Sequence, residues 1–203
     1  MPVTRRRFIA ISAAAGGLPL LPLAPARAAP LLRVWSGTAL GCDATLQIHH
    51  PDPAIADRLI AASLAEVRRL ECIMSLYRPD SALSRLNRDG VLKDPPFDLV
   101  RVLSEARRYS ALSGGAFDVT VQPLWDLYAG HFSRPDASPD GPPADAIIEA
   151  VARVGQDALE IDPVRLRFAR PGMGITLNGV GHGYITGAPG EAGAIQPVQI
   201  RSG

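Results

Sequence analysis

The sequence predicts an α+β domain in which helices pack on a mixed sheet. Three observations lead to this fold class. The chain has 203 residues, which fits one domain. It is 47% hydrophobic and 20% charged, an ordinary globular composition. Its apolar patterns run strand, strand, helix, helix, strand, helix, strand, strand, and this order does not fit a regular alternation of strands and helices around a parallel sheet.

Residues 1–28 have the features of an export signal. Arg5, Arg6 and Arg7 precede a weakly apolar stretch, and "ARA" at 26–28 is a small-x-small cleavage pattern. The paired arginines favour the twin-arginine route, which predicts a periplasmic mature chain. A membrane anchor is the alternative, but Gly and Pro interrupt the apolar stretch and leave it short for a stable span.

Charge and cysteine content exclude some function classes. Residues 1–28 carry four of the 21 Lys and Arg, so the remainder has 17 basic against 20 acidic residues, and no nucleic-acid surface is expected. Cys42 and Cys72 either pair in an exported protein or act as small buried hydrophobes. The four histidines are scattered, so a zinc site made by the protein alone is not expected.

The first half of the domain predicts two strands and two helices. Residues 31–50 are rich in apolar and β-branched residues with bends at Gly37 and Gly41, which is typical of paired strands. Asp52 is a suitable N-cap for a helix over 53–74, which Pro79 cannot continue.

Spacings of three and four residues predict that one face of this first helix points inward, and that face carries Ile60, Leu64, Val67, Leu70 and Ile73. Residues 81–90, "SALSRLNRDG", are interpreted as a turn-rich link. A second helix is predicted over 95–115, with Leu99, Leu103 and Ala106 inward and Gly114–Gly115 as its C-terminal stop.

The second half predicts one helix among strands. Residues 116–128 are interpreted as a strand that then bends, and 131–145 as a polar, Pro-rich surface loop. A third helix is predicted over 144–155. Residues 158–177 are interpreted as strands joined by turns at 162–163 and 171–172.

Three segments combine residues suited to binding a nucleotide. In "MSLYRPDSALSRLN", residues 74–87, Tyr77 could stack on a planar ring and Arg78 or Arg85 could meet phosphate. The alternative is a helix connection in which Tyr77 caps the core. "SGGAFDVTVQPLWDLY", residues 113–128, places Phe117 and Asp118 after two glycines, which is also compatible with a simple helix end feeding a strand.

The third segment is the glycine run "TLNGVGHGYIT", residues 176–186. A strand followed by glycines and a helix start exposes backbone amides that favour anions, and glycine lets the backbone approach a ligand closely. A bare carbonyl there could face Mg²⁺, which prefers oxygen ligands. The run is not GxGxxG, so the tight-turn alternative stays open on this segment alone.

Together these segments, with "WSGTALG" upstream, resemble the ApbE family, the FAD:protein FMN transferases, from about Trp35 to Thr186. The resemblance is strongest to the twin-arginine-exported branch linked to nitrous oxide respiration, and it implies the T-fold-related ApbE fold. It implies binding of FAD and Mg²⁺, and transfer of FMN to a Thr or Ser hydroxyl of an electron-transfer protein with release of AMP.

The resemblance also implies site residues. The FAD contacts are Leu40, Tyr77, Ala116, Phe117, Asp118, Thr176 and His182, and the backbone metal ligand is Gly179. Three of these positions depart from the family pattern: Leu40 stands for the usual Met, Thr176 for Asp and His182 for Lys. No residue matches a catalytic base.

The resemblance predicts three parts of the chain: the signal at 1–28, the N-terminal part of a flavin transferase domain at 29–186, and an unrelated tail at 187–203. The tail is rich in Gly and Pro and lacks the helix and second metal motif of the family, so an out-of-frame or truncated end is the hypothesis. The alternatives to transferase activity are hydrolysis of FAD to FMN and AMP, and a non-catalytic fragment with at most weak FAD binding.

Overall fold

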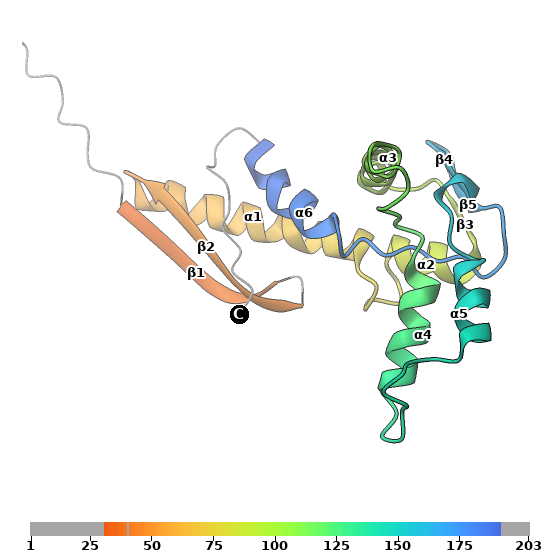
Figure 1. Ribbon diagram of the computed structural model, residues 1–203. Helices are drawn as coiled ribbons and strands as arrows, with labels where there is room; N and C mark the ends of the chain where they lie inside the picture. The colour runs from red at the N-terminus through yellow and green to blue at the C-terminus, as the bar shows by residue number, and fades with distance from the viewer. Residues whose placement is uncertain (1–30, 40, 192–203) are drawn as a thin grey trace, which may run out of the picture.

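The computed structural model describes residues 31–39 and 41–191 (Figure 1). The α+β class is confirmed, with helices around two small sheets. Both sheets are antiparallel, and the one parallel pairing in the described part is an isolated bridge between Val121 and Gly174. The predicted signal at 1–28 lies outside the described residues.

The first sheet is formed by the two strands predicted over residues 31–50. Strands β1 (Leu31–Ala39) and β2 (Cys42–His50) pair in antiparallel register, and Gly41 adopts a φ of 74° at the turn. Every second residue of β2 faces inward, because successive strand residues point to opposite faces. Ala44, Leu46 and Ile48 are therefore buried, and the last two pack with Ala56 of the first helix.

The first helix, α1 (Pro53–Met74), begins as predicted. The Asp52 carboxylate accepts hydrogen bonds from the backbone N–H groups of Ala54 and Ile55, at 2.8 and 3.3 Å. Its C-terminal turns enter the main core, where Leu70 and Ile73 are buried. The other three residues of the predicted stripe are only partly buried.

A short helix replaces the predicted link at 81–90. In α2 (Ala82–Asp89), the Ser81 hydroxyl accepts from the N–H of Ser84 at 2.9 Å, and Gly90 ends the helix with a φ of 72°. Leu83 and Leu86 are fully buried one turn apart. The prediction of a link was wrong because the local turn residues are the two caps of a helix that core packing stabilises.

The next helix, α3 (Phe97–Leu112), matches its prediction: Leu99, Leu103 and Ala106 are all buried. The predicted strand within 116–128 is wrong. Residues 122–132 form α4 (Gln122–Phe132), which has Pro123 in its first turn and no buried residue. A proline fits a first turn because its missing N–H would have no helical partner there.

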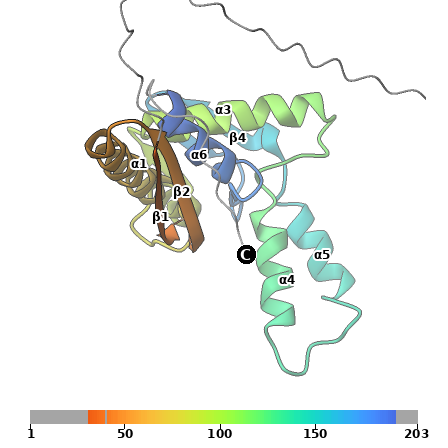
Figure 2. The same ribbon diagram turned by 90° about the vertical axis from the view of Figure 1, so that its left-hand side faces the viewer.

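Helix α5 (Ala144–Val151) follows the predicted surface loop and ends four residues before Gly155. It packs beside α4, and the two helices form an arm that projects from the rest of the molecule in both ribbon views (Figure 2).

The second sheet has the order β3-β5-β4. It joins β3 (Val91–Lys93), which the sequence did not reveal, to β5 (Arg165–Phe168) and β4 (Leu159–Asp162). A 3₁₀ turn, η1 (Gln156–Ala158), precedes β4. The strand predicted to end at residue 177 does not form, and that segment is instead an irregular run whose Met173, Ile175 and Leu177 are buried.

The last described helix, α6 (Gly181–Glu191), begins within the glycine run and extends beyond Thr186. The predicted boundary at residue 186 stays a prediction. Most of the buried side chains form a single cluster, which α1, α2, α3 and the second sheet share with residues 173–185. Within the described ranges, no helix combines the length and apolar character needed to cross a membrane.

Candidate functional site

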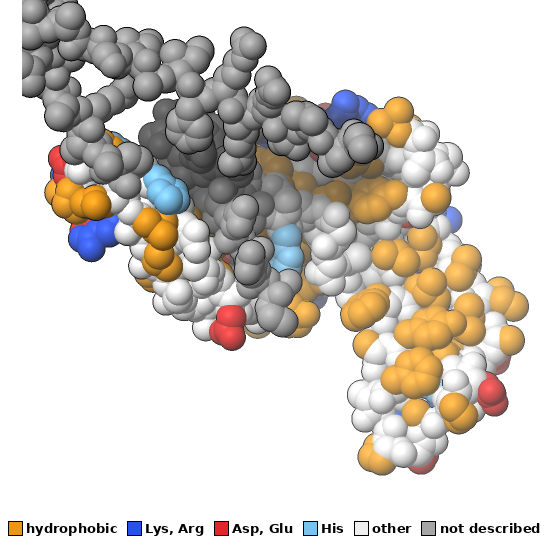
Figure 3. Space-filling model, turned by 60° about the vertical axis from the view of Figure 1, so that its left-hand side comes forward, with side chains coloured by type: hydrophobic (Ala, Val, Ile, Leu, Met, Phe, Trp, Pro, Cys, Tyr) orange, Lys and Arg blue, Asp and Glu red, His pale blue; other side chains and the backbone are white. Residues whose placement is uncertain are grey.

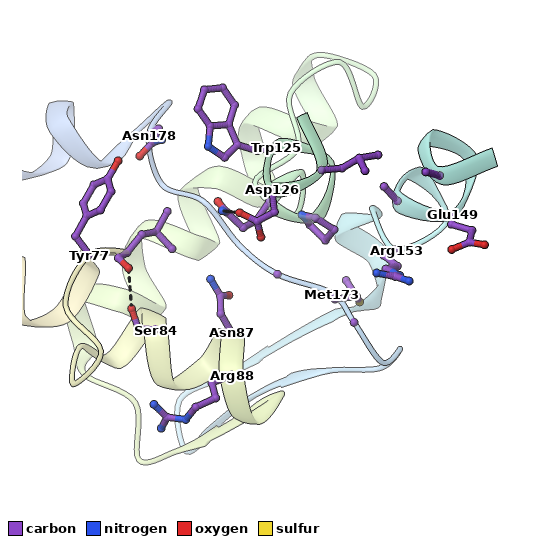
Figure 4. Close-up of a pocket in the computed structure, with 18 of the residues that line it drawn as sticks. Tyr77, Ser84, Asn87, Arg88, Trp125, Asp126, Glu149, Arg153, Met173 and Asn178 are labelled. Atoms are coloured by element: carbon purple, nitrogen blue, oxygen red, sulfur yellow. Dashed lines mark hydrogen bonds between the residues drawn. The ribbon is translucent and has the colours of Figure 1, made fainter. Parts of the chain in front are cut away.

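Two hollows meet at the loop after α1. The large cleft has a volume of about 1050 Å³ and lies between α2, α4, α5 and residues 172–178 (Figure 4). The small pocket has a volume of about 320 Å³ and lies between the C-terminal end of α1 and the start of α6. Leu76, Tyr77 and Asn178 line both hollows, so the two adjoin.

Tyr77 stands at this junction with 88% of its surface exposed. Two hydrogen bonds fix the loop that carries Tyr77, because the hydroxyls of Ser81 and Ser84 both donate to the carbonyl of Ser75, at 2.6 and 3.1 Å. The interpretation of Tyr77 as a cap on the core is therefore wrong. Its ring is free to stack on a planar ligand, which is the role the resemblance implies.

The other aromatic residue with an implied role, Phe117, lies beside the glycine run. A Cβ atom added at Gly179 would come within 3.1 Å of Cε2 of Phe117, closer than ordinary packing allows. The sequence therefore uses glycine at 179 because the Phe117 ring occupies the space of a side chain. The structure thus brings together two segments that the resemblance assigns to the same site.

Asp118 is engaged by the protein itself. One carboxylate oxygen accepts from the N–H and the hydroxyl of Thr120, at 2.8 and 2.6 Å, and the other accepts from the N–H of Gln156 at 2.9 Å. Asp118 therefore fixes the turn that carries Ala116 and Phe117. Residues 116–118 line neither hollow.

The glycine run places His182 in the small pocket. The N–H of Thr176 donates to the carbonyl of Val119 at 2.8 Å and ties the start of the run to the neighbouring segment. Because α6 starts at Gly181, the exposed His182 lies in the first helical turn. His182 and Tyr77 line the same pocket, whereas Thr176 lines neither hollow. The N-terminus of a helix that also carries a histidine favours binding of an anionic group.

A network of charged groups holds α6 against the body of the protein. The hydroxyl of Tyr184 donates to Asp98 at 2.7 Å, and the guanidinium of Arg69 bridges Asp98 and Glu66 at 2.8 and 2.7 Å. Burial raises the pKa of Asp98, but hydrogen bonds from Arg69 and Tyr184 outweigh burial and hold that pKa below its ordinary value. A hydrogen bond from Arg69 likewise lowers the pKa of Glu66.

Leu40 lies outside the described residues. The implied Mg²⁺ position at Gly179 can be compared with the ligand groups that the described residues offer. Gly179 offers only its backbone carbonyl, and the described part of the chain contains no group of three or more His, Cys, Asp or Glu side chains that could hold a metal. Mg²⁺ commonly takes one or two oxygen ligands from a protein and the others from water and substrate phosphates, so the carbonyl of Gly179 is compatible with one such ligand.

The walls of the large cleft were missed by sequence reasoning. They include Asn87 on α2, Trp125 on α4 and Arg153 just after α5. The usable signal was the spacing of Trp125, Tyr128 and Phe132, which are three and four residues apart and so share one helical face. It was hidden because residues 116–128 were interpreted as a strand.

Comparisons with known proteins identify relatives of this chain. A sequence profile of the ApbE family matches residues 40–192. The chain is 31% identical over 167 residues to a FAD:protein FMN transferase of Klebsiella pneumoniae (strain 342), covering 79% of this chain and 47% of that protein. It is 33% identical over 119 residues to the same enzyme of Haemophilus influenzae, covering 55% and 34% of the two chains.

Solved structures agree on the fold. The flavin transferase ApbE from Vibrio cholerae superposes with a TM-score of 0.69 at 25% identity, covering 80% of this chain and 53% of that one. The Pseudomonas stutzeri flavinyl transferase ApbE, in its apo form, gives 0.68 at 26% identity, covering 81% and 52%. The chain spans about half the length of the relatives it matches. The extent of these matches shows that the chain belongs to the ApbE family.

Proposed function

We propose that this chain acts in the transfer of FMN from FAD to a Thr or Ser hydroxyl of a partner electron-transfer protein, with release of AMP. The observation that carries the proposal is the small pocket, where Tyr77 and His182 face the same space. The resemblance assigns both residues to FAD, and the names of the relatives support flavin transfer.

The transfer replaces the phosphoanhydride bond of FAD by a phosphate ester bond to the acceptor. The hydroxyl oxygen attacks the phosphorus on the FMN side of the pyrophosphate and forms a new P–O bond. The P–O bond to the AMP phosphate breaks, AMP leaves, and the hydroxyl proton is lost to the surroundings. In such a step the protein contributes mainly position and charge stabilisation.

The residues of the small pocket are suited to those two tasks. Tyr77 offers an exposed ring for stacking, and the loop that carries it is held by the hydroxyls of Ser81 and Ser84. His182 in the first turn of α6 faces the same pocket, where it would lie near an anionic phosphate. Gly179, three residues before His182, lets the backbone lie close to the ring of Phe117.

The proposal includes a Mg²⁺ requirement and a periplasmic location reached by the twin-arginine route. A bound divalent ion would neutralise charge on the pyrophosphate. The metal requirement rests on the family resemblance, which implies the backbone carbonyl of Gly179 as a ligand. The location rests on the arginine pair and cleavage pattern of residues 1–28.

Flavin transfer can be measured directly. The chain is mixed with FAD, Mg²⁺ and a candidate acceptor protein, and attachment is detected as a mass increase equal to FMN minus one water. Tyr77→Ala is expected to weaken FAD binding about three- to tenfold, because a stacking contact contributes about 0.5–1.5 kcal/mol. Phe97→Ala is the matched control, since Phe97 is 76% exposed and lines neither hollow.

The outcomes separate the candidate activities. Attachment that EDTA abolishes supports the full proposal. Release of FMN and AMP without attachment assigns water as the acceptor and a hydrolase activity. Absence of saturable FAD binding by the chain, measured from flavin fluorescence, would reject both activities.

A further inference from the structure

The large cleft has no role in the site that the resemblance assigns. Among the described residues implied to contact FAD, Tyr77 alone lines it. Transfer needs two substrates whose reacting atoms meet, and the large cleft adjoins the small pocket through Leu76, Tyr77 and Asn178. Its position therefore suits the second substrate.

The charges of the cleft argue against a second polyanion. The lining includes two arginines, Arg88 and Arg153, and two acids, Asp126 and Glu149 (Figure 4). The guanidinium of Arg88 is already paired with both carboxylate oxygens of Asp89, at 2.9 and 3.0 Å. A lining with balanced charge gives no net attraction for a pyrophosphate, whereas it is compatible with a polypeptide of mixed or neutral charge.

A hydrogen-bonding group in the cleft wall also lacks a partner. The Nε2 of Gln122 donates to Asp126 at 2.6 Å, but its Oε1 is buried with no hydrogen bond among the described residues. A buried acceptor without a donor costs free energy, which an incoming N–H group would recover if the Gln122 side chain turned its Oε1 toward the cleft. Each non-proline residue of a polypeptide backbone carries such an N–H.

An exposed aromatic surface continues from the cleft along α4. Trp125 is 60% exposed and lines the cleft, and Tyr128 and Phe132 follow on the same helical face, over about 10 Å of helix. We call these three residues the aromatic stripe. Hydrophobic side chains cover the projecting arm in the space-filling view (Figure 3). An apolar surface extending beyond a cleft is typical of protein recognition, in which Trp and Tyr often dominate the binding free energy.

We propose that the large cleft and the aromatic stripe bind the polypeptide that receives the flavin group. The inference rests on the proposed function, because it assigns the acceptor's place beside the FAD site. The bound segment is extended, carries little net charge, brings an apolar side chain to Trp125 and places a Thr or Ser hydroxyl near Tyr77.

The first test measures binding without any chemistry. Random decapeptides with a fixed central Thr are selected on the full chain, and the enriched peptides are titrated against variants. Trp125→Ala is expected to weaken their binding about tenfold or more, since an aromatic anchor contributes most to such an interface. Phe97→Ala, which also removes an exposed ring, is expected to leave binding unchanged.

A second variant reports on the opposite wall. Arg153→Gln removes a cationic group that has no ion pair among the described residues and lines the cleft near the end of α5. It is expected to weaken the same peptides severalfold. Weaker peptide binding by both Trp125→Ala and Arg153→Gln supports occupation of the cleft. Peptide affinities equal to that of the wild type for both variants overturn the proposal.

Binding measurements with FAD distinguish a polypeptide site in the large cleft from flavin binding in the small pocket. Saturating FAD is expected to leave the peptides bound, and Trp125→Ala is expected to keep the wild-type affinity for FAD. Displacement of the peptides by FAD would assign the cleft to FAD and overturn the inference. Peptide binding in the cleft by a chain that does not bind FAD would reject the proposed function and support the polypeptide site.

Two further outcomes reject the inference outright. One is failure to enrich any peptide. The other is self-association of the chain that Trp125→Ala abolishes, measured by light scattering, since it would assign the aromatic stripe to a second copy.

Discussion

The carboxylate of Asp118 joins two segments that lie 38 residues apart in the chain. It accepts three hydrogen bonds, two from Thr120 and one from the N–H of Gln156. Because the resemblance implies a FAD contact for the same residue, a loss of FAD binding on substitution has two possible origins. The stability of the fold distinguishes a structural role from direct contact.

We expect Asp118→Ala to lower the free energy of unfolding by about 2–4 kcal/mol, because it leaves donors of Thr120 and Gln156 without their acceptor. Urea denaturation measures the loss. Asp136→Ala is the matched control, since Asp136 is exposed and pairs with the exposed Arg134. Equal urea midpoints for the two variants would contradict the structural role.

At this scale the family resemblance assigned Phe117 and Gly179 to one site, and the structure places the ring of one against the backbone of the other. The network of Arg69, Asp98 and Tyr184 was not predicted, because its members come from three helices and no local pattern links them. Side chains that meet only through tertiary packing leave no signal in a single sequence.

Among the elements, α2 and α4 show why local patterns failed. The Ser81 and Gly90 pair that suggested a link forms the caps of α2. The β-branched residues Val119 and Val121 suggested a strand, yet the hydrogen bonds of Asp118 to Thr120 fix a turn and Pro123 then starts a helix. In contrast, α1 and α3 have long periodic stripes and were predicted correctly.

The backbone conformations assigned to the end of α2 and to α4 can be tested by replacing one glycine in each with alanine. Gly90→Ala is expected to destabilise the protein by about 1 kcal/mol, because Gly90 has a φ of 72°. Gly130→Ala is expected to stabilise it by about 0.4–1 kcal/mol, because Gly130 lies within α4 with open space around it. Urea denaturation of both variants measures the opposite signs, and a shift in the same direction would contradict the assigned backbone conformations.

On the scale of the whole molecule, the α+β class was predictable and the sheet order was not. Strand β3 pairs with β5, so Val91 lies opposite Arg167 across more than seventy residues of chain. Such pairings depend on how the helices pack, which a sequence pattern does not encode. The same packing decides where α6 sits, and α6 carries the pocket residue His182.

Tyr184 gives α6 a polar contact with this packing, beside the buried Ile185. Its hydroxyl donates to Asp98 of α3, and Arg69 of α1 pairs with the same carboxylate. The pKa of Asp98 is lowered in the folded protein, so its stabilising effect is present above the ordinary value near 4 and is lost as the pH falls through the folded value. The contribution of Tyr184 to stability therefore depends on pH in the acid range.

We expect Tyr184→Phe to lower the free energy of unfolding by about 1–2 kcal/mol at pH 7, a value below that of a fully buried charged hydrogen bond because Asp98 is partly solvated. Between pH 7 and pH 3 the difference from the wild type should narrow, because the stabilising effect of the Asp98 charge is lost as the pH falls from the ordinary value toward the lowered pKa. Urea denaturation at both pH values measures this change. Tyr128→Phe is the control, since the described residues offer no hydrogen-bond partner to the Tyr128 hydroxyl.

The same variant tests whether the network positions the small pocket. If Tyr184 fixes α6, Tyr184→Phe should also weaken FAD binding severalfold at pH 7, because His182 lies two residues away in the same helix. Tyr128→Phe should leave FAD binding unchanged. A variant that loses stability but binds FAD with wild-type affinity would show that the pocket keeps its geometry without this anchor, and the contact would then serve the fold alone.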